Sequence, residues 1–212
     1  GIYLNHSNLN TILSSVTGGN KYGIYLHFSL NNSIDGAFGC DNLVYPFYFD
    51  HYTKGTKGTG NGGVPNYEHI ARNSGFVTWQ CSKVTSCGAL NEPRTYYYLN
   101  SSLSSNGTCI SMRGTDQAFT CLSNMHGYAL TGSGEAGSAG ILINDSERPS
   151  IFNCIISNYA NGVAIYGSKD ITVRKTAVSM SSSSGILAAN SEGITISEVD
   201  AFSNANGISF EN

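Results

Sequence analysis

A short sequence pattern recurs along this chain at a nearly fixed spacing. The tetrapeptide Gly-Ile-Tyr-Leu occupies residues 1–4 and returns 22 residues later at 23–26. A glycine followed by alternating apolar residues also recurs, at intervals of 22 or 23 residues, at Gly140, Gly162, Gly185 and Gly207. Periods of roughly 20 to 50 residues are typical of stacked architectures, in which one repeat buries its apolar face only against its neighbours. The spacing therefore predicts a solenoid.

The apolar residues within each repeat alternate over short stretches. One repeat carries them at Val163 and Ile165, then at Ile171 and Val173, then at Val178. Such alternation of β-branched residues indicates short strands with one buried face, and no segment shows a convincing helical stripe. Three strands per repeat, separated by polar corners, predict an all-β fold, a parallel β-helix with coils of about 22 residues. We expect it to be right-handed, because parallel crossovers strongly prefer that hand.

Serine and glycine take fixed places in the repeat. A serine follows each of the five complete repeat starts by six residues, at Ser7, Ser29, Ser146, Ser168 and Ser191. We expect these serines to stack as a ladder at a bend, where the hydroxyl satisfies backbone groups that leave the sheet. The repeat-start glycine fits a corner that needs positive φ or close backbone approach. Asn161 and Asn206, each just before such a glycine, fit the same corner.

We expect residues 1–212 to form a single β-helix domain with loop insertions at 39–75 and 88–106, where the repeat is least regular. A coil begins at Gly1 and another is incomplete at Asn212, and neither end carries an obvious polar cap. Open coils expose unpaired strand edges. We therefore expect the domain to be part of a longer chain, or to stack on other copies or on further β-helix domains.

Charge and hydropathy exclude several classes of partner. The formal net charge is −3, only 12% of residues are charged, and no basic cluster occurs, which argues against nucleic-acid binding. No apolar run reaches the roughly 18 residues of a membrane-spanning helix. Cysteine and histidine show no zinc-binding spacing, and the carboxylates show no calcium-loop spacing. We expect no metal and no cofactor.

Six cysteines bear on the compartment. They are Cys40, Cys81, Cys87, Cys109, Cys121 and Cys154. Disulfides are the favoured interpretation, with the pairing left open, and they predict an extracellular or cell-surface protein. The alternative is buried free thiols in a ladder, and Cys154 lies at a core position of the repeat.

N-glycosylation sequons are compatible with that setting. They occur at Asn5, Asn31, Asn100, Asn106 and Asn144. A chain this rich in Asn, Ser and Thr contains about this many by chance, so they permit a glycoprotein without requiring one. We expect Asn100 and Asn106, in a polar serine-rich stretch, to be the most exposed.

Aromatic residues gather in the irregular middle of the chain. Insertions in solenoids leave the corners and often cover the binding face. The residues that we expect to contact glycans or a partner are Tyr45, Tyr48, Tyr52, Trp79 and Tyr96. The alternative is that these rings seal a loop onto the barrel.

Catalytic signals are weak. The sharpest cluster is Asp50, His51, Glu68, His69 and Arg72, which holds the groups needed for glycoside hydrolysis or proton abstraction from a uronic acid. Charged residues of a long loop are ordinarily solvated, so we assign no catalytic residue.

Other charged residues have structural explanations. Arg113, Asp116 and His126 are explained by a surface ion pair. Lys169, Arg174 and Lys175 are explained by a solvent-facing strand edge.

The segment 154–196, which reads CIISNYANGVAIYGSKDITVRKTAVSMSSSSGILAANSEGITI, resembles parallel β-helix repeats of the pectin-lyase-like superfamily. More narrowly, it is similar to β-helix segments of eukaryotic cell-surface proteins of the fibrocystin type. The resemblance implies a fold far more strongly than an activity. The motifs of polygalacturonase-like and pectate-lyase-like enzymes are missing, so it carries over no catalytic residue.

These patterns together predict a non-catalytic extracellular structural or adhesive β-helix glycoprotein module. We expect it to carry covalent N-glycans and to stack end to end into a fibre or a larger surface protein. The alternatives are a carbohydrate-active enzyme, acting as a polysaccharide lyase or hydrolase, and a carbohydrate-binding module.

Overall fold

The computed structural model describes residues 1–13, 15, 17–40, 42–63, 73, 75–123 and 126–212 and shows an all-β chain. The chain divides into two compact units, Gly1–Cys81 and Ser82–Asn212, hereafter unit 1 and unit 2. Each unit is built from parallel strands that pair with their equivalents one coil along, as the repeat predicts.

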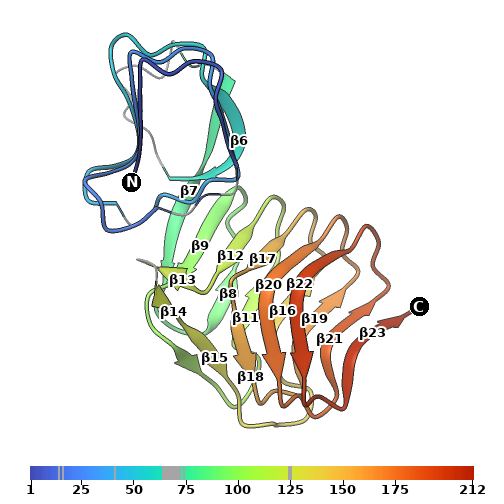
Figure 1. Ribbon diagram of the computed structural model, residues 1–212. Helices are drawn as coiled ribbons and strands as arrows, with labels where there is room; N and C mark the ends of the chain where they lie inside the picture. The colour runs from blue at the N-terminus through green and yellow to red at the C-terminus, as the bar shows by residue number, and fades with distance from the viewer. Residues whose placement is uncertain (14, 16, 41, 64–72, 74, 124–125) are drawn as a thin grey trace. The chain divides into compact units, whose positions relative to one another are not determined.

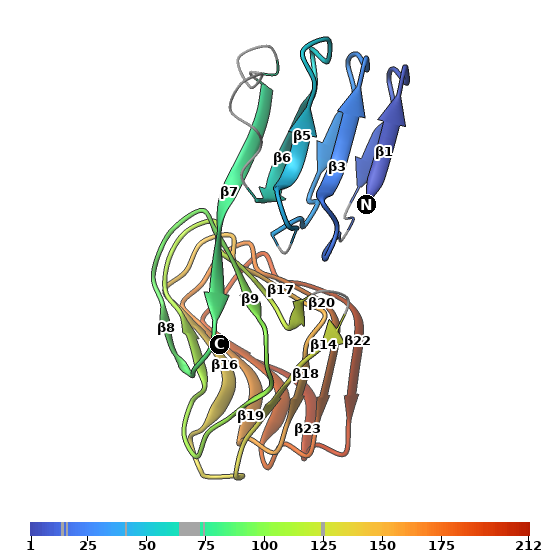
Figure 2. The same cartoon turned by 90° about the vertical axis from the view of Figure 1, so that its left-hand side faces the viewer.

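Unit 1 contains two parallel sheets. The first consists of β1 (Ile2–Asn5), β3 (Tyr22–His27) and β5 (Tyr45–Phe49), which lie side by side in Figure 2. The second consists of β2 (Thr11–Leu13), β4 (Ser33–Asp35), β6 (Lys57–Gly62) and β7 (Gly75–Val84), the last of which runs on into unit 2. Ile2 pairs with Ile24, and Ile24 pairs with Phe47, so inward side chains stack directly on one another.

Unit 2 is built from the same kind of coil and stacks more coils than unit 1 (Figure 1). One sheet runs through β8 (Gly88–Leu90), β11 (Ile110–Met112), β16 (Ala139–Asn144), β19 (Asn161–Tyr166), β21 (Ser184–Ala189) and β23 (Asn206–Glu211). A second ladder runs through β9 (Thr95–Leu99), β12 (Ala118–Thr120), β17 (Ser150–Phe152), β20 (Thr172–Ser179) and β22 (Thr195–Phe202). A third runs through β10 (Leu103–Ser104), β15 (Ala129–Thr131) and β18 (Ile155–Ser157), which pairs with the second half of β20. The short strands β13 (Leu122–Ser123) and β14 (His126–Gly127) form an antiparallel pair.

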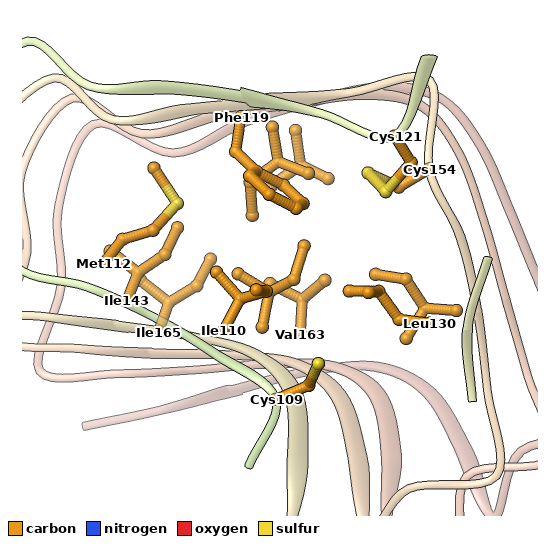
Figure 3. Close-up of a cluster of buried hydrophobic side chains, with 14 of the residues drawn as sticks. Cys109, Ile110, Met112, Phe119, Cys121, Leu130, Ile143, Cys154, Val163 and Ile165 are labelled. Carbon is orange, nitrogen blue, oxygen red and sulfur yellow. A yellow bond between two sulfur atoms is a disulfide. The ribbon is translucent and has the colours of Figure 1, made fainter. Parts of the chain in front are cut away.

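The core of unit 2 consists of ladders of fully buried aliphatic residues. Val163 and Ile165 of β19 stack on their equivalents in β16 and β21 and are completely inaccessible to solvent. Figure 3 shows Met112, Ile143 and Ile165 in one such ladder, with Phe119 and Leu130 facing it across the coil. Burying each large aliphatic side chain contributes about 1.5–3 kcal/mol, so the stacked coils are stabilised mainly by these ladders.

The repeat-start glycines are explained by close packing. None of Gly23, Gly140, Gly162, Gly185 and Gly207 has a positive φ. A Cβ on Gly162 would lie 1.9 Å from Cγ1 of Val178 and 2.7 Å from the carbonyl oxygen of Gly185. The positive-φ alternative was therefore wrong for these glycines. Close approach is confirmed for Gly23, Gly140, Gly162 and Gly185, whereas a Cβ on Gly207 would meet only Ala201, at 4.0 Å.

The left-handed corner lies elsewhere in the coil. Asn161 and Asn206, expected at such a corner, instead begin strands β19 and β23 and lack positive φ. The residue just before each ladder serine has the left-handed backbone, at His6, Phe28, Asp145, Gly167 and Asn190. The chain turns at this residue, where asparagine, aspartate and glycine are tolerated best.

The serine ladder is confirmed in both units. Every one of the five hydroxyls donates to the carbonyl oxygen two residues earlier, at distances from 2.7 to 3.2 Å. The Oγ atoms of Ser29, Ser168 and Ser191 also accept a hydrogen bond from the backbone amide of the preceding ladder serine. The hydroxyl thus links consecutive coils where the backbone leaves the sheet.

The two expected insertions contain ladder strands, so treating the whole of 39–75 and 88–106 as loops was wrong. β5 and β6 lie in the first segment, and β9 and β10 lie in the second. Tyr96 still pairs with Ala118 at the regular spacing of 22 residues. One coil of unit 2 is longer than the others. It is the coil that separates β11 from β16, in which Ile110 pairs with Ile141. Aromatic side chains obscured the glycine-apolar pattern in segments that keep the coil.

All six cysteines form disulfides, so the free-thiol alternative for Cys154 was wrong. The pairs are Cys40–Cys81 in unit 1 and Cys87–Cys109 and Cys121–Cys154 in unit 2. Cys121, Cys109 and Cys154 are almost fully buried. Cys121 and Cys154 lie at the edge of the core in Figure 3.

Candidate functional site

The outward face of the β1–β3–β5 sheet is covered with aromatic rings. Because side chains alternate along a strand, Ile24 and Leu26 point into the core while Tyr25 points outward. Tyr3, Tyr25 and Tyr48 occupy equivalent outward positions on β1, β3 and β5. Tyr22 and Tyr45, at the start of β3 and β5, extend this tyrosine ladder. These five tyrosines are called the aromatic face.

The rings of the aromatic face contact one another. The centroids of Tyr3 and Tyr25 are 5.1 Å apart, those of Tyr25 and Tyr48 are 4.8 Å apart, and those of Tyr22 and Tyr48 are 4.6 Å apart. Tyr3 is 56% exposed and Tyr45 is 36% exposed, whereas the other three are half-buried. Mutual packing fixes the rings while part of each remains open to solvent, so the aromatic face is an ordered and partly exposed surface.

A second aromatic row lies at the corner that follows the strands. The ring of His6 stacks on that of Phe28 at 4.8 Å, with 4° between the ring planes. Phe28 in turn stacks on Tyr52 at 4.1 Å, with 11° between the planes. Tyr52 is 56% exposed. This corner stack of His6, Phe28 and Tyr52 follows from the coil repeat, since His6 and Phe28 occupy the same left-handed position one coil apart.

A buried carboxylate supports the corner stack from beneath. Asp50 is only 8% exposed and accepts hydrogen bonds from the amides of Phe28 and Thr53 and from the Thr53 hydroxyl. Its Oδ2 lies 2.7 Å from Nδ1 of His27, a contact not aligned as a hydrogen bond. Burial alone would raise the pKa of Asp50, but these hydrogen bonds and the nearby imidazole outweigh burial and lower it. The carboxylate therefore stays ionised and orders the turn.

The structure brings together only part of the predicted contact set. Tyr45 and Tyr48 lie on the aromatic face, and Tyr52 lies in the corner stack. Trp79 is half-buried on β7, in the other sheet of unit 1. Tyr96 belongs to unit 2 and is 3% exposed against Phe152, so the expectation that it contacts a partner was wrong.

Sequence reasoning missed Tyr3, Tyr22, Tyr25 and the corner pair His6 and Phe28. The signal was present, since the third residue of both Gly-Ile-Tyr-Leu repeats is the outward tyrosine. The inward positions of the repeat alone do not reveal it. β5, which lies in the irregular middle of the sequence, therefore carries the third tyrosine of a ladder that begins on β1.

The predicted catalytic cluster is only partly described. Asp50 has the structural hydrogen bonds given above, and His51 is exposed, with its ring in edge contact with Tyr52. Glu68, His69 and Arg72 lie outside the described residues. The oxygens of Asp50 accept hydrogen bonds from its own turn and from the adjacent coil, so this carboxylate has a structural role.

The charged residues of unit 2 form surface ion pairs with partners that differ from those expected. Asp116 pairs with Nε of Arg148 at 2.8 Å rather than with Arg113, and Arg148 also contacts Glu147. Nζ of Lys169 lies 2.8 Å from Glu192. Nothing is described of the His126 side chain. Such exposed pairs are screened by solvent and contribute little to stability.

The remaining predicted basic residues also take structural positions. Arg174 lies over the ring of Phe152 at 5.5 Å, and Lys175 is exposed at a corner with positive φ.

The sequons differ in exposure. Asn5, Asn31 and Asn106 are exposed, whereas Asn100 and Asn144 are half-buried. Oδ1 of Asn100 is buried, so the expectation that Asn100 is among the most exposed was wrong. In the sequons at Asn5 and Asn144, the serine hydroxyl donates to the carbonyl of the asparagine itself. Occupancy of the five sites stays a prediction.

The described residues hold neither a metal-binding cluster nor a membrane-spanning helix. No group of three or more His, Cys, Asp or Glu side chains there is arranged to hold a metal ion. None of the described segments forms a helix long and apolar enough to cross a membrane.

Comparison with solved structures yields distant likenesses. The A-module of mannuronan C-5 epimerase AlgE4 from Azotobacter vinelandii matches at 12% identity with a TM-score of 0.38, over 97% of this chain and 57% of that chain. Trypsin-treated QnrB1, a plasmid-mediated fluoroquinolone resistance protein, matches at 9% identity with a TM-score of 0.19, over 92% of each chain. Both TM-scores are low, and neither likeness carries an argument about activity.

Comparison with protein families is more decisive. No curated protein matches the chain, and the likeness to fibrocystin-type segments stays a prediction. The model of the family described as "Right handed beta helix region" matches residues 74–212, well over half of the chain. The protein therefore belongs to the right-handed β-helix family.

Proposed function

We propose that this protein is a non-catalytic extracellular β-helix module that adheres to carbohydrate through the aromatic face and corner stack of unit 1. The single observation that carries the proposal is the register of Tyr3, Tyr25 and Tyr48, which stacks partly exposed phenol rings along three coils. Three disulfides are compatible with an extracellular setting.

The chemistry of the aromatic face suits a sugar. Phenol rings offer rigid apolar area together with a hydroxyl that can donate or accept, at low cost in side-chain entropy. A pyranose presents C–H groups on its faces and hydroxyls at its rim, which complement both parts of a tyrosine.

The polar groups around the rings point to a neutral sugar. Between the aromatic face and the corner stack lie the imidazole of His27 and the Asp50 carboxylate that contacts it. Lys21 lies 5.2 Å from the ring centroid of Tyr22 and is the one lysine or arginine with a described contact to these rings. Anionic uronates would need a denser set of basic groups to offset their desolvation. We therefore expect neutral glycan chains to bind in preference to acidic ones.

Affinity electrophoresis through gels containing neutral or acidic polysaccharides tests this proposal. We expect retardation of the wild type by neutral chains, without release of reducing ends or unsaturated products. Tyr3→Ala and Tyr52→Ala should each weaken binding by about fivefold to thirtyfold, the equivalent of losing one ring contact worth roughly 1–2 kcal/mol.

Phe202→Ala is the matched control, since Phe202 is an equally exposed aromatic residue of unit 2. The proposal fails if no polysaccharide retards the wild type, or if Phe202→Ala weakens binding as much as Tyr52→Ala does. Stacking of further coils or copies stays a prediction.

A further inference from the structure

The tyrosines of the aromatic face are close enough to react with one another. Tyr22 and Tyr48 come from successive coils, and their ring centroids are 4.6 Å apart with 37° between the planes. Tyr25 lies 4.8 Å from Tyr48, but its ring meets that of Tyr48 edge-on at 85°. Tyr45 lies farther from Tyr48, at 6.0 Å. The shortest of these separations therefore joins Tyr22 and Tyr48.

We propose that the aromatic face is an oxidative cross-linking site, at which Tyr22 and Tyr48 join through a carbon–carbon bond between their rings. A bond of ordinary single-bond length, about 1.5 Å, would place the two ring centroids about 4.3 Å apart. The observed 4.6 Å is close to that value. Both side chains are half-buried, so solvent reaches them. Coupling also requires the two rings to turn edge to edge.

The reaction needs an oxidant, which we identify by class as hydrogen peroxide acting through a haem peroxidase. Each phenol gives up one electron to the oxidant and its hydroxyl proton to solvent, which leaves two phenoxyl radicals. The radicals couple through the ring carbons next to the hydroxyl-bearing carbons. One proton then moves from each coupled carbon to each oxygen and restores two phenols. One peroxide molecule is reduced to two waters, so two hydrogen atoms are lost from the protein.

The surroundings of the three closest rings favour Tyr22–Tyr48 over Tyr25–Tyr48. Burial raises the pKa of Tyr25, and the nearby Tyr48 phenol and Asp50 carboxylate raise it further. A phenol that holds its proton more tightly is harder to convert to a neutral radical. The edge-on arrangement of Tyr25 also places one ring edge against the other ring's face, rather than edge to edge.

The cross-link would tie consecutive coils of unit 1 covalently on their outer face. Disulfide Cys40–Cys81 already closes a segment of the same unit. A second closure constrains the unfolded chain further, which suits a module that bears load outside the cell. This inference does not rest on glycan binding, since coupling needs only the tyrosine geometry.

The test uses the whole protein at high dilution with peroxidase and hydrogen peroxide. We expect dityrosine fluorescence, an intact mass lower by two hydrogen atoms without doubling, and a cross-linked peptide pair containing Tyr22 and Tyr48. The intramolecular product should be lost in Tyr22→Phe and in Tyr48→Phe, which keep the ring and hence the packing. Tyr166→Phe, a half-buried tyrosine of β19, is the control and should leave the product unchanged.

Circular dichroism of each variant establishes that it is folded before oxidation. Three results would overturn the inference: no dityrosine in the wild type, covalent dimers alone, or an intramolecular product that survives in both Tyr22→Phe and Tyr48→Phe.

Discussion

Units 1 and 2 carry different side chains at the same position of the same coil. Two residues after the coil start, unit 1 has Tyr3, Tyr25 and Tyr48, and unit 2 has Leu142, Ala164 and Leu187. The corner position differs in the same way. His6 and Phe28 stand in unit 1 where Asp145, Gly167 and Asn190 stand in unit 2.

By contrast, the inward positions are buried and apolar in both units, and the serine ladder is alike in the two. The β-helix is thus a scaffold whose inward residues set stability, while its outward residues are free to form a site.

The largest expected effect concerns the scaffold of unit 2. Replacing Cys121 and Cys154 together by alanine removes a cross-link over a sequence separation of 33 residues. In the chain-entropy account, a closure of this length contributes about 3–4 kcal/mol. We expect the free energy of unfolding to fall by that amount, measured by hydrogen exchange in β12 and β17.

The double variant of Cys87 and Cys109 is the comparison, since it opens a shorter separation of 22 residues and should cost slightly less. A loss below about 1 kcal/mol for Cys121 and Cys154 would contradict the entropic account.

The next effect tests the coil-start glycine. Gly162→Ala would place a methyl group against Val178 and against the carbonyl of the next coil. Overpacking of this kind costs about 1–3 kcal/mol, which chemical denaturation would measure as a lower midpoint at unchanged slope. Gly88→Ala is the control, because a Cβ there meets nothing within 4 Å. Equal destabilisation by both variants would show that the glycine is needed for another reason.

Period and alternation were sufficient to predict the coil, its parallel pairing and its serine ladder. They follow from inward residues, and burial imposes the same demand on every coil. Residues 39–75 were misread because Phe47 and Phe49 occupy inward positions that other coils fill with aliphatic residues. The ring size changed the appearance of β5 without changing its pairing with β3.

The site was harder to predict for a physical reason. Outward residues point away from the core, so core packing does not decide which residue stands there, and the repeat pattern does not reveal them. Tyr3 and Tyr25 were visible at equal offsets, but only the parallel register shows that Tyr48 continues their row. Likewise, no pattern in the sequence pairs His27 with Asp50, because the contact joins adjacent coils.

The third prediction concerns the carboxylate beneath the corner stack. In Asp50→Asn an amide NH₂ would face the Phe28 amide if it takes the place of Oδ2, so a donor would meet a donor. We expect a loss of about 1–3 kcal/mol, observed as lower protection of β3 and β5 in hydrogen exchange. Asp200→Asn on β22, where the carboxylate is exposed, should have little effect.

The same carboxylate predicts a pH dependence. Its pKa is lowered in the folded state, so the unfolded state binds the proton more readily and the contribution of Asp50 is complete above the ordinary value of 3.8. That contribution is lost as the pH falls through the lower pKa of the folded protein. The difference in stability between wild type and Asp50→Asn should therefore shrink on acidification below about pH 4. A difference that stays constant down to strong acid would rule out this linkage.

The smallest expected loss of stability is that of Ser7→Ala, which is compared with Ser168→Ala at another position of the serine ladder. Ser168 is fully buried, and its hydroxyl both donates to the carbonyl of Tyr166 and accepts from the amide of Ser146. Ser168→Ala leaves that buried amide without its partner, which costs about 1–3 kcal/mol. Ser7 only donates to Asn5, at a half-buried corner of unit 1, so Ser7→Ala should cost less than about 0.5 kcal/mol. Thermal unfolding of the two variants measures the difference. If both cost the same, the ladder acts through local turn formation alone, since the bond to the carbonyl two residues earlier is the one that both serines make.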